Sequence, residues 1–421
     1  MTNQSTRREA SAPADGSDLP APAPTSSLML IASTSSSPHL NPCLPLLLCG
    51  SFLVSSPLAT DRSWRVQLSF SLGSEKVVVR PTEGAIEMAA AMADPSCPPF
   101  PLLAEEGHHE QHEHQEVPHG GELEVPTVDL QAPGEALAAA CRRLGVFRLA
   151  NHGVPGDLSA RLFALARDLL GRAPFLDKQA QPGYFWGTPA LSSLRVRDVN
   201  WVEGFHVALA GQQQHRPVTA AAAPPPSDDL AAALRDLARE YGAHMARVAR
   251  ALFDALAAAL GLGSEQSSAY LAERDGFLRV YRYPPCPEPG HLGMEAHTDS
   301  SVLSVINQDL VGGLQVLHDG AWRDVAPAGR GDAGTLLVNL GDMARAISGD
   351  AWRSVRHRVA ASRAAERLSL CYFAFPRDDA VITCAGGSRY RPFTYAEFRE
   401  QVQADIKATG SKVGLERFLR H

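Results

Sequence analysis

The chain has 421 residues, of which 45% are hydrophobic and 20% are charged, so most of it can bury an apolar core and global disorder is excluded. Its net charge of −7 argues against a protein that binds nucleic acid or an anionic membrane surface. No apolar run reaches the roughly 18 residues that a membrane span requires. The seven scattered cysteines include no Cys-x-x-Cys pair, which predicts a reduced protein of the cytoplasm, with the nucleus as an alternative.

Residues 1–120 differ in composition from the rest and are predicted to form a disordered leader. Residues 10–60 are rich in Ser, Pro and Ala, and such a stretch buries too little apolar area to offset its ordering entropy. A short apolar run at 44–54 leaves a signal or transit peptide open, and translation that starts at an internal methionine such as Met92 is another alternative. The His-rich tract at 105–116 could bind metal, but a solvated acidic loop is the favoured interpretation.

Residues 121–265 are predicted to form an N-terminal helical region. Helices are expected over 135–144 and 157–170, and Gly145 ends the first of them, because a positive φ costs glycine little. Beyond an Ala- and Pro-rich loop, apolar residues recur every three or four positions from Leu230 to Leu260. That spacing is typical of one long helix packed along a single face.

Residues 266–421 change to short β-prone runs that are separated by turn sequences such as Asp319-Gly320, a hairpin signal. The predicted strands are 277–283, 302–307, 314–317, 322–325, 335–340, 355–360 and 368–375. A final helix is expected over 392–405. The predicted fold is therefore mixed but mainly β: a double-stranded β-helix, or jelly roll, flanked by N-terminal and C-terminal helices.

Two histidines and one aspartate in this β region form the strongest chemical signal. His297 and Asp299 are two residues apart, and on a strand such residues point to the same face. His357 lies on a later predicted strand and could reach the same point from across the jelly roll. Two imidazoles and one carboxylate on one side of a metal ion form the facial triad of non-haem Fe(II) oxygenases, which leaves positions open for a co-substrate and O2.

Ten residues after His357, Arg367 and Ser369 repeat the two-residue spacing and offer a guanidinium and a hydroxyl on one face. Arg is the natural bidentate partner of a carboxylate. An Arg-x-Ser sequence alone carries little information. The fixed order of His-x-Asp, His and Arg-x-Ser along one β region is what makes the pattern specific.

With these motifs in place, the sequence from about 124 to 418 resembles the plant 2-oxoglutarate- and Fe(II)-dependent dioxygenases. The matching stretches are 144–147, 151–154, 283–287, 293–299, 312–316, 338–342, 354–359 and 366–369. The resemblance implies that His297, Asp299 and His357 bind Fe(II). It also implies that Arg367, Ser369 and Tyr283 bind the distal carboxylate of 2-oxoglutarate.

The cofactors implied by this family are Fe(II), 2-oxoglutarate as co-substrate, O2 and a supporting role for ascorbate. One departure affects the co-substrate contacts: Tyr281 stands where the family usually has Asn. The protein supplies geometry and exclusion of water, whereas the redox chemistry belongs to the metal and the 2-oxo acid.

The segments 186–189 and 201–207 resemble gibberellin 2-oxidases of the branch that acts on C20 precursors, which implies a gibberellin-like diterpenoid acid as substrate and 2β-hydroxylation as the reaction. Trp201 and Phe205 are the candidate substrate contacts, although ordinary core packing is the favoured explanation for such residues. Alternatives are oxidation at another gibberellin position as in 20-oxidases, another plant metabolite such as an auxin or a flavonoid, or a non-catalytic ligand-binding jelly roll. The sequence does not indicate the oligomeric state.

Overall fold

The computed structural model describes residues 95–100, 117–187, 200–209, 226–272, 276–287, 291–328, 334–384, 387 and 389–420, with side chains from residue 228 in the fourth of these segments. Before residue 80 it describes only the backbone of short strands: β1 (Met29–Leu30), β2 (Leu48–Cys49), β3 (Ser51–Val54), β4 (Val66–Leu72) and β5 (Glu75–Val79). The chain divides into two compact units, Met1–Ala91 and Met92–His421. The His-rich tract at 105–116 lies outside the described residues, and the disordered leader stays a prediction.

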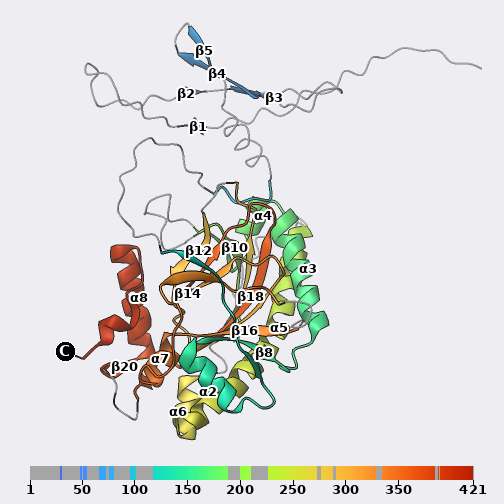
Figure 1. Cartoon of the computed structure of the whole chain (residues 1–421). Helices are drawn as coiled ribbons and strands as arrows, with labels where there is room; N and C mark the ends of the chain where they lie inside the picture. Colours follow the sequence, from blue (N-terminus) through green and yellow to red (C-terminus); the bar gives the residue numbers. More distant parts are fainter. Residues whose placement is uncertain are drawn as a thin grey trace, which may run out of the picture. The chain divides into compact units, whose positions relative to one another are not determined.

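The second unit is built on two facing β-sheets, drawn in Figure 1. The larger sheet has eight strands in the order β7 (Thr127–Asp129), β8 (Val146–Ala150), β16 (Leu336–Leu340), β13 (Leu303–Gln308), β18 (Arg367–Ala374), β11 (Phe277–Tyr283), β10 (Glu203–Ala208) and β9 (Tyr184–Trp186). The smaller has five, in the order β12 (Leu292–His297), β17 (His357–Ala360), β14 (Leu314–His318), β15 (Ala321–Asp324) and β6 (His119–Glu122). Pairing is antiparallel except between β7 and β8 and between β15 and β6. The predicted jelly roll is confirmed.

A cluster of apolar side chains from both sheets fills the interior of the jelly roll. Tyr283 and Ile306 of the larger sheet and Leu314 and Val359 of the smaller one belong to it, and all four are buried. Because alternate residues of each strand face this interior, polar side chains at the strand ends are carried to its open mouth. That mouth is where the chemistry of the candidate site gathers.

Helices cover the outer face of the larger sheet. α3 (Gly156–Arg172) and α5 (Pro226–Ala259) pack on each other and against β11 and β18, on the side of the molecule opposite α8 in Figure 1. The predicted stripe of α5 is confirmed, since Leu234, Tyr241 and Leu252 are fully buried. The long amphipathic helix therefore makes the sheet a rigid platform for the strand ends at the mouth.

The remaining elements close the ends of the domain. They are α2 (Gly134–Arg143), α4 (Phe175–Gln179), α6 (Ser264–Tyr270), α7 (Asp342–Ile347), β19 (Val381–Ile382), β20 (Phe393–Thr394), α8 (Tyr395–Thr409) and the 3-10 helix η3 (Gly414–Phe418). Gly145 follows α2 with φ of 72°, as predicted, and a Cβ there would lie 2.1 Å from the Arg353 carbonyl oxygen. Among the helices of the described segments, none combines the length and apolarity needed to cross a membrane.

Residues 95–100, which fall within the predicted leader, belong to the second unit and pack on its core. The Phe100 ring stacks on Trp201 with 4.4 Å between centroids and meets Trp186 edge-on at 5.7 Å. The Ser96 hydroxyl donates a hydrogen bond of 3.0 Å to the carbonyl oxygen of Gly171. A short stretch before residue 120 therefore contributes to the folded structure, whatever the rest of the leader does.

Candidate active site

The three predicted metal ligands meet at one point at the mouth of the jelly roll. β12 ends at His297 and β17 begins at His357, and these two residues are direct partners across the strands. The two imidazole centroids lie 4.3 Å apart. Oδ1 of Asp299 lies 3.6 Å from Nε2 of His297 and 3.8 Å from Nε2 of His357. The predicted convergence of the three side chains is confirmed.

The backbone does not place Asp299 by strand alternation, as the sequence pattern predicted. β12 stops at His297, so Asp299 lies in the connection to β13 and strand alternation does not orient it. Instead, its carbonyl oxygen accepts a hydrogen bond from the amide of Asp342 at 2.8 Å, and its Oδ2 accepts one from the Ser304 hydroxyl at 2.7 Å. Fixed hydrogen bonds in the connection, rather than strand geometry, place this carboxylate.

Hydrogen bonds also set the tautomers of both imidazoles. Nδ1 of His297 donates a hydrogen bond of 2.7 Å to the backbone carbonyl oxygen of Glu295. Nδ1 of His357 donates one of 3.2 Å to the carbonyl oxygen of Val355. In each ring the proton is therefore assigned to Nδ1, which leaves the Nε2 lone pair directed at Asp299. This is the arrangement that metal-binding histidines need.

The charges fit the same role. Burial alone would raise the pKa of Asp299, but His357, His297 and the Ser304 hydroxyl together hold that pKa well below its usual range. Burial and the neighbouring His297 lower the pKa of His357 to about 4. At neutral pH the site thus offers a carboxylate and a neutral imidazole, the protonation states in which these groups bind a divalent cation. Two imidazoles and one carboxylate are the donor set of non-haem Fe(II) sites, so the residues fit Fe(II).

Next to this cluster lies a buried guanidinium that has no carboxylate partner among the described residues. Arg367 is 3% exposed, and its side chain donates to the Ser369 hydroxyl at 3.2 Å and to Oε1 of Gln308 at 2.9 Å. Its Nε is buried without any hydrogen-bond partner in the described structure. The guanidinium lies 4.9 Å from the ring centre of Tyr283. A buried guanidinium with an unused hydrogen-bond donor is a suitable partner for an anionic ligand.

Arg367, Ser369 and Tyr283 line one narrow cavity together with His297, Asp299 and His357. All six residues predicted for the metal and the co-substrate therefore face one space. Gln308 was missed by the sequence analysis, because only the pairing of β13 with β18 brings it beside Ser369.

A larger cavity of about 840 Å³ adjoins the metal-ligand cluster on the side of the C-terminal segment. His297 and Asp299 line both spaces, so the two cavities meet at the cluster. The walls of the larger one combine apolar side chains such as Phe373, Phe375, Val402 and Leu415 with charged ones of both signs. The cations are Arg279, Arg345, Arg356 and Lys412, and the carboxylates are Glu295, Asp299, Asp342 and Glu416. A cavity of this size, with apolar side chains beside cations, suits a small organic acid.

The two residues predicted to contact the substrate lie elsewhere. Phe205 is fully buried in the main core, edge-on to Tyr184. Trp201 is 5% exposed and stacks on Phe100. Neither lines either cavity, as far as the described residues go. The adjoining residues 188–189 of the same resemblance lie outside the described part of the chain. Packing, the alternative weighed for these side chains, accounts for both of them.

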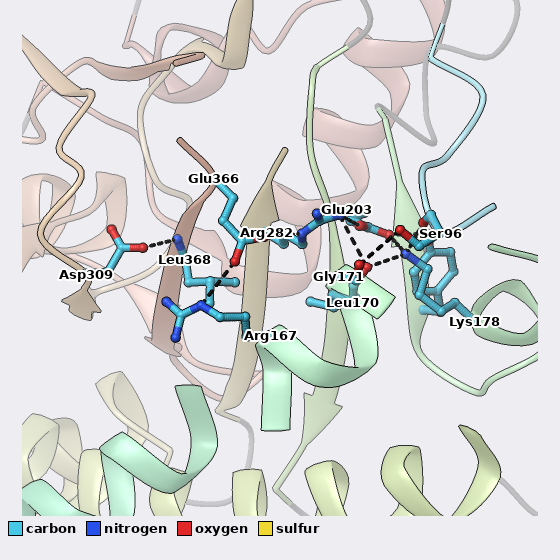
Figure 2. Close-up of polar contacts among 11 residues, drawn as sticks. Ser96, Arg167, Leu170, Gly171, Lys178, Glu203, Arg282, Asp309, Glu366 and Leu368 are labelled. Atoms are coloured by element: carbon cyan, nitrogen blue, oxygen red, sulfur yellow. Dashed lines mark hydrogen bonds and ion pairs between the residues drawn. The ribbon is translucent and has the colours of Figure 1, made fainter. Parts of the chain in front are cut away.

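Glu203, which lies between these two residues in the sequence, belongs to a buried ion-pair cluster, shown in Figure 2. Lys178 and Glu203 have fully buried side chains whose charged atoms lie 2.6 Å apart. Arg282 bridges Glu203 at 2.7 Å and Glu366 at 2.8 Å. The lysine also donates to the carbonyl oxygens of Ser96 and Leu170, both at 2.6 Å. Every charge in this cluster has a protein partner, so its role is structural.

Comparison with known proteins agrees with the fold and the site. The sequence profile of the 2OG-Fe(II) oxygenase superfamily matches residues 274–376, which include all six candidate residues for metal and co-substrate. The chain belongs to this superfamily, whose members use Fe(II) and 2-oxoglutarate.

The chain is also similar to individual relatives and to a solved structure. The chain is 38% identical to gibberellin 2-beta-dioxygenase 6 of Oryza sativa subsp. japonica, over 71% of this chain and 86% of the relative. It is 35% identical to gibberellin 2-beta-dioxygenase 8 of Arabidopsis thaliana, over 71% and 88%. The crystal structure of a rice dioxygenase for auxin oxidation superimposes with a TM-score of 0.54 at 29% identity, covering 70% of this chain and all of that one.

Proposed function

We propose that this protein is a gibberellin 2-oxidase: it hydroxylates a gibberellin-like diterpenoid acid at the 2β position and so inactivates the hormone. The observation that carries the oxidative chemistry is the convergence of His297, Asp299 and His357 beside buried Arg367, which has no carboxylate partner among the described residues. The gibberellin substrate is supported by relatives named gibberellin 2-beta-dioxygenases, at 35% and 38% identity.

Each residue of the site has a defined task in this proposal. His297, Asp299 and His357 hold Fe(II) through Nε2 of the two imidazoles and through the Asp299 carboxylate. Arg367 and Ser369 bind the distal carboxylate of 2-oxoglutarate, and the Tyr283 hydroxyl donates to the same group. When bound, Fe(II) and 2-oxoglutarate supply the oxidising chemistry, in which O2 converts the 2-oxo acid to succinate and CO2 and a C–H bond to C–OH.

The protein itself contributes binding and orientation. Ser369, on the same strand as Arg367, and Gln308, on the neighbouring strand β13, both accept hydrogen bonds from Arg367. The guanidinium is therefore fixed before a ligand arrives. A carboxylate bound there meets a positive charge that is already oriented, so little reorganisation of the site is needed. The substrate enters the larger cavity, whose aromatic and aliphatic side chains hold it with one C–H bond close to the metal ligands.

The test is an assay of the purified full-length protein with Fe(II), 2-oxoglutarate, ascorbate and a panel of gibberellins. We expect succinate release that depends on a gibberellin, together with an equal amount of a product one oxygen atom heavier, whose hydroxyl position is read by NMR. The His297→Ala variant should release no succinate above background. If no gibberellin yields a hydroxylated product, this substrate is excluded.

An auxin is the second candidate, because the rice dioxygenase for auxin oxidation aligns over its whole length with this chain. The same assay with indole-3-acetic acid separates the two substrates. Oxidation of the auxin alone would retain the proposed chemistry and replace the gibberellin as substrate. If neither compound stimulates 2-oxoglutarate consumption, another plant metabolite is favoured as the substrate.

A further inference from the structure

We propose that Arg279 and Tyr281 form a subsite that binds a carboxylate group of the organic substrate in the larger cavity. The inference rests on the proposed function, since it assumes that an apolar carboxylic acid enters this cavity. It adds two recognition residues to those assigned to 2-oxoglutarate: Arg279, which lines only the larger cavity, and Tyr281, which lines both cavities.

Arg279 is a cation of the larger cavity that forms no ion pair among the described residues. It lies on β11, and its guanidinium is surrounded by the rings of Phe277, Phe185 and Phe373, at 5.2, 5.6 and 6.0 Å from their centres. Within the described residues no carboxylate forms an ion pair with it. The aromatic rings hold the guanidinium in place but cannot neutralise its charge fully.

The other cations that line the cavity are different. The Arg345 guanidinium lies 2.6 Å from the carboxylate of Asp350, and Nζ of Lys412 lies 2.7 Å from that of Asp342. Arg356 is exposed to solvent at the cavity wall. Arg279 is therefore the partly buried cation of this cavity whose charge is left for a ligand.

The hydrogen bonds of Arg279 and Tyr281 also leave donors available to a ligand. Nη1 of Arg279 donates to the Tyr281 hydroxyl at 3.1 Å, while its Nε is buried with no partner among the described residues. Because the Tyr281 oxygen accepts that bond, the tyrosine proton needs a different acceptor, and no side chain or carbonyl of the described structure accepts it. Burial raises the pKa of Tyr281, so the hydroxyl keeps its proton as a donor. Two donors from adjacent side chains match the two oxygens of a carboxylate.

The position of the pair suits a substrate rather than a structural role. Tyr281 is 5% exposed and lines both the larger cavity and the narrow one that contains Arg367. Its direct strand partner is Ser369 of the co-substrate pocket. A carboxylate bound by Arg279 and Tyr281 would thus anchor one end of a ligand whose body lies against the metal ligands, which fixes the C–H bond that is presented.

The decisive experiment compares a carboxylic acid with its methyl ester, which keeps the carbon skeleton and removes the charge. Binding is measured by calorimetry on anaerobic full-length protein loaded with Fe(II) and 2-oxoglutarate, so turnover plays no part. We expect a gibberellin to bind the unaltered protein at least about tenfold more tightly than its ester. Arg279→Met should bring that ratio close to one while the affinity of the ester changes little.

Two further variants keep the inference falsifiable. Tyr281→Phe removes only the hydroxyl and should lower the acid-to-ester ratio about threefold, even if Arg279→Met fails to fold. Arg356→Met removes a charge of the same type from the same cavity wall and should leave the ratio unchanged. If Arg279→Met or Tyr281→Phe keeps the full preference for the acid, the inference is wrong. It is equally wrong if either variant weakens 2-oxoglutarate binding and leaves the ratio untouched.

The outcome separates this inference from the proposed function. If neither gibberellin acid nor ester binds, the gibberellin substrate fails, and the same comparison is made with indole-3-acetic acid and its methyl ester. A preference for that acid that depends on Arg279 would support the subsite and reject the gibberellin. Absence of any acid preference in the unaltered protein, with both compounds, would overturn the subsite.

Discussion

Two buried polar clusters in one domain differ in whether their groups are satisfied by the protein. In the Lys178–Glu203 cluster each charge meets an opposite charge or a carbonyl oxygen, and nothing is left for a ligand. In the cluster of His297, Asp299 and His357, both Nε2 atoms and one carboxylate oxygen converge on a shared point without hydrogens between them. The comparison teaches that burial of charge alone does not mark a functional site, whereas unsatisfied ligand atoms aimed at one point do.

The largest expected effect follows from removing one metal ligand. His297→Ala should lower succinate release at least about 1,000-fold, because a bound metal contributes several kcal/mol to such reactions. Since the His297 side chain is 34% exposed, the same change should lower the free energy of unfolding by less than about 1 kcal/mol. Activity assays and urea denaturation measure the two quantities. As the control, His119→Ala removes an exposed histidine of the same sheet and should alter neither.

The opposite pattern is expected in the ion-pair cluster. Glu203→Gln removes the charge that balances the fully buried Lys178 and should lower the free energy of unfolding by about 3–5 kcal/mol. The activity of the molecules that remain folded should be close to normal. Asp168→Asn, which breaks the exposed pair with Arg172, should cost no more than about 1 kcal/mol. If the Glu203→Gln protein is stable but has little activity, the structural role of this cluster is contradicted.

A smaller effect should come from the groups that orient the ligands. Ser304→Ala removes the hydrogen bond to Oδ2 of Asp299 and should weaken Fe(II) binding about 10–100-fold in an anaerobic titration against a competing chelator. Ser301→Ala is the matched control, since that hydroxyl contacts Ser304 at 3.0 Å and not the carboxylate. Equal losses in both variants would show that the serine pair acts through packing.

The smallest effect concerns a histidine outside both clusters. Burial, and then the nearby Arg279, lower the pKa of His206 to about 4 in the folded protein. The unfolded chain, with a pKa near 6.5, binds the proton first, so the stability associated with neutral His206 is present above about pH 6.5 and is lost as the pH falls toward 4. Urea denaturation at several pH values should show a shallower loss for His206→Phe, which retains a ring in contact with Phe277. Identical pH slopes would contradict the assignment.

Much of the fold could be predicted because its signals are local. The spacing of Leu234, Tyr241 and Leu252 defines the buried face of α5, and Gly145 ends α2 at the expected place. Turn residues separate the strands, so their order along the chain could be read directly. The triad also depends on a short-range pattern, His297 with Asp299, plus one later histidine on a strand.

The rest depends on contacts between residues far apart in sequence. Nothing near Lys178 signals that Glu203 and the carbonyl oxygen of Ser96 will surround it. Gln308 reaches Arg367 only through the register of β13 on β18. Trp201 and Phe205 stand out in the sequence, yet the tertiary packing places them in cores rather than at the cavity. Long-range pairing, not local propensity, decides these positions.

The central claim is that one ferrous ion is bound by the three converging side chains. Anomalous X-ray scattering at the iron edge, from crystals grown anaerobically with Fe(II), tests it most directly. We expect a single strong peak bonded to Nε2 of His297, Nε2 of His357 and the carboxylate of Asp299. A peak at any other group of residues, or no peak beside these three at saturating Fe(II), would contradict it.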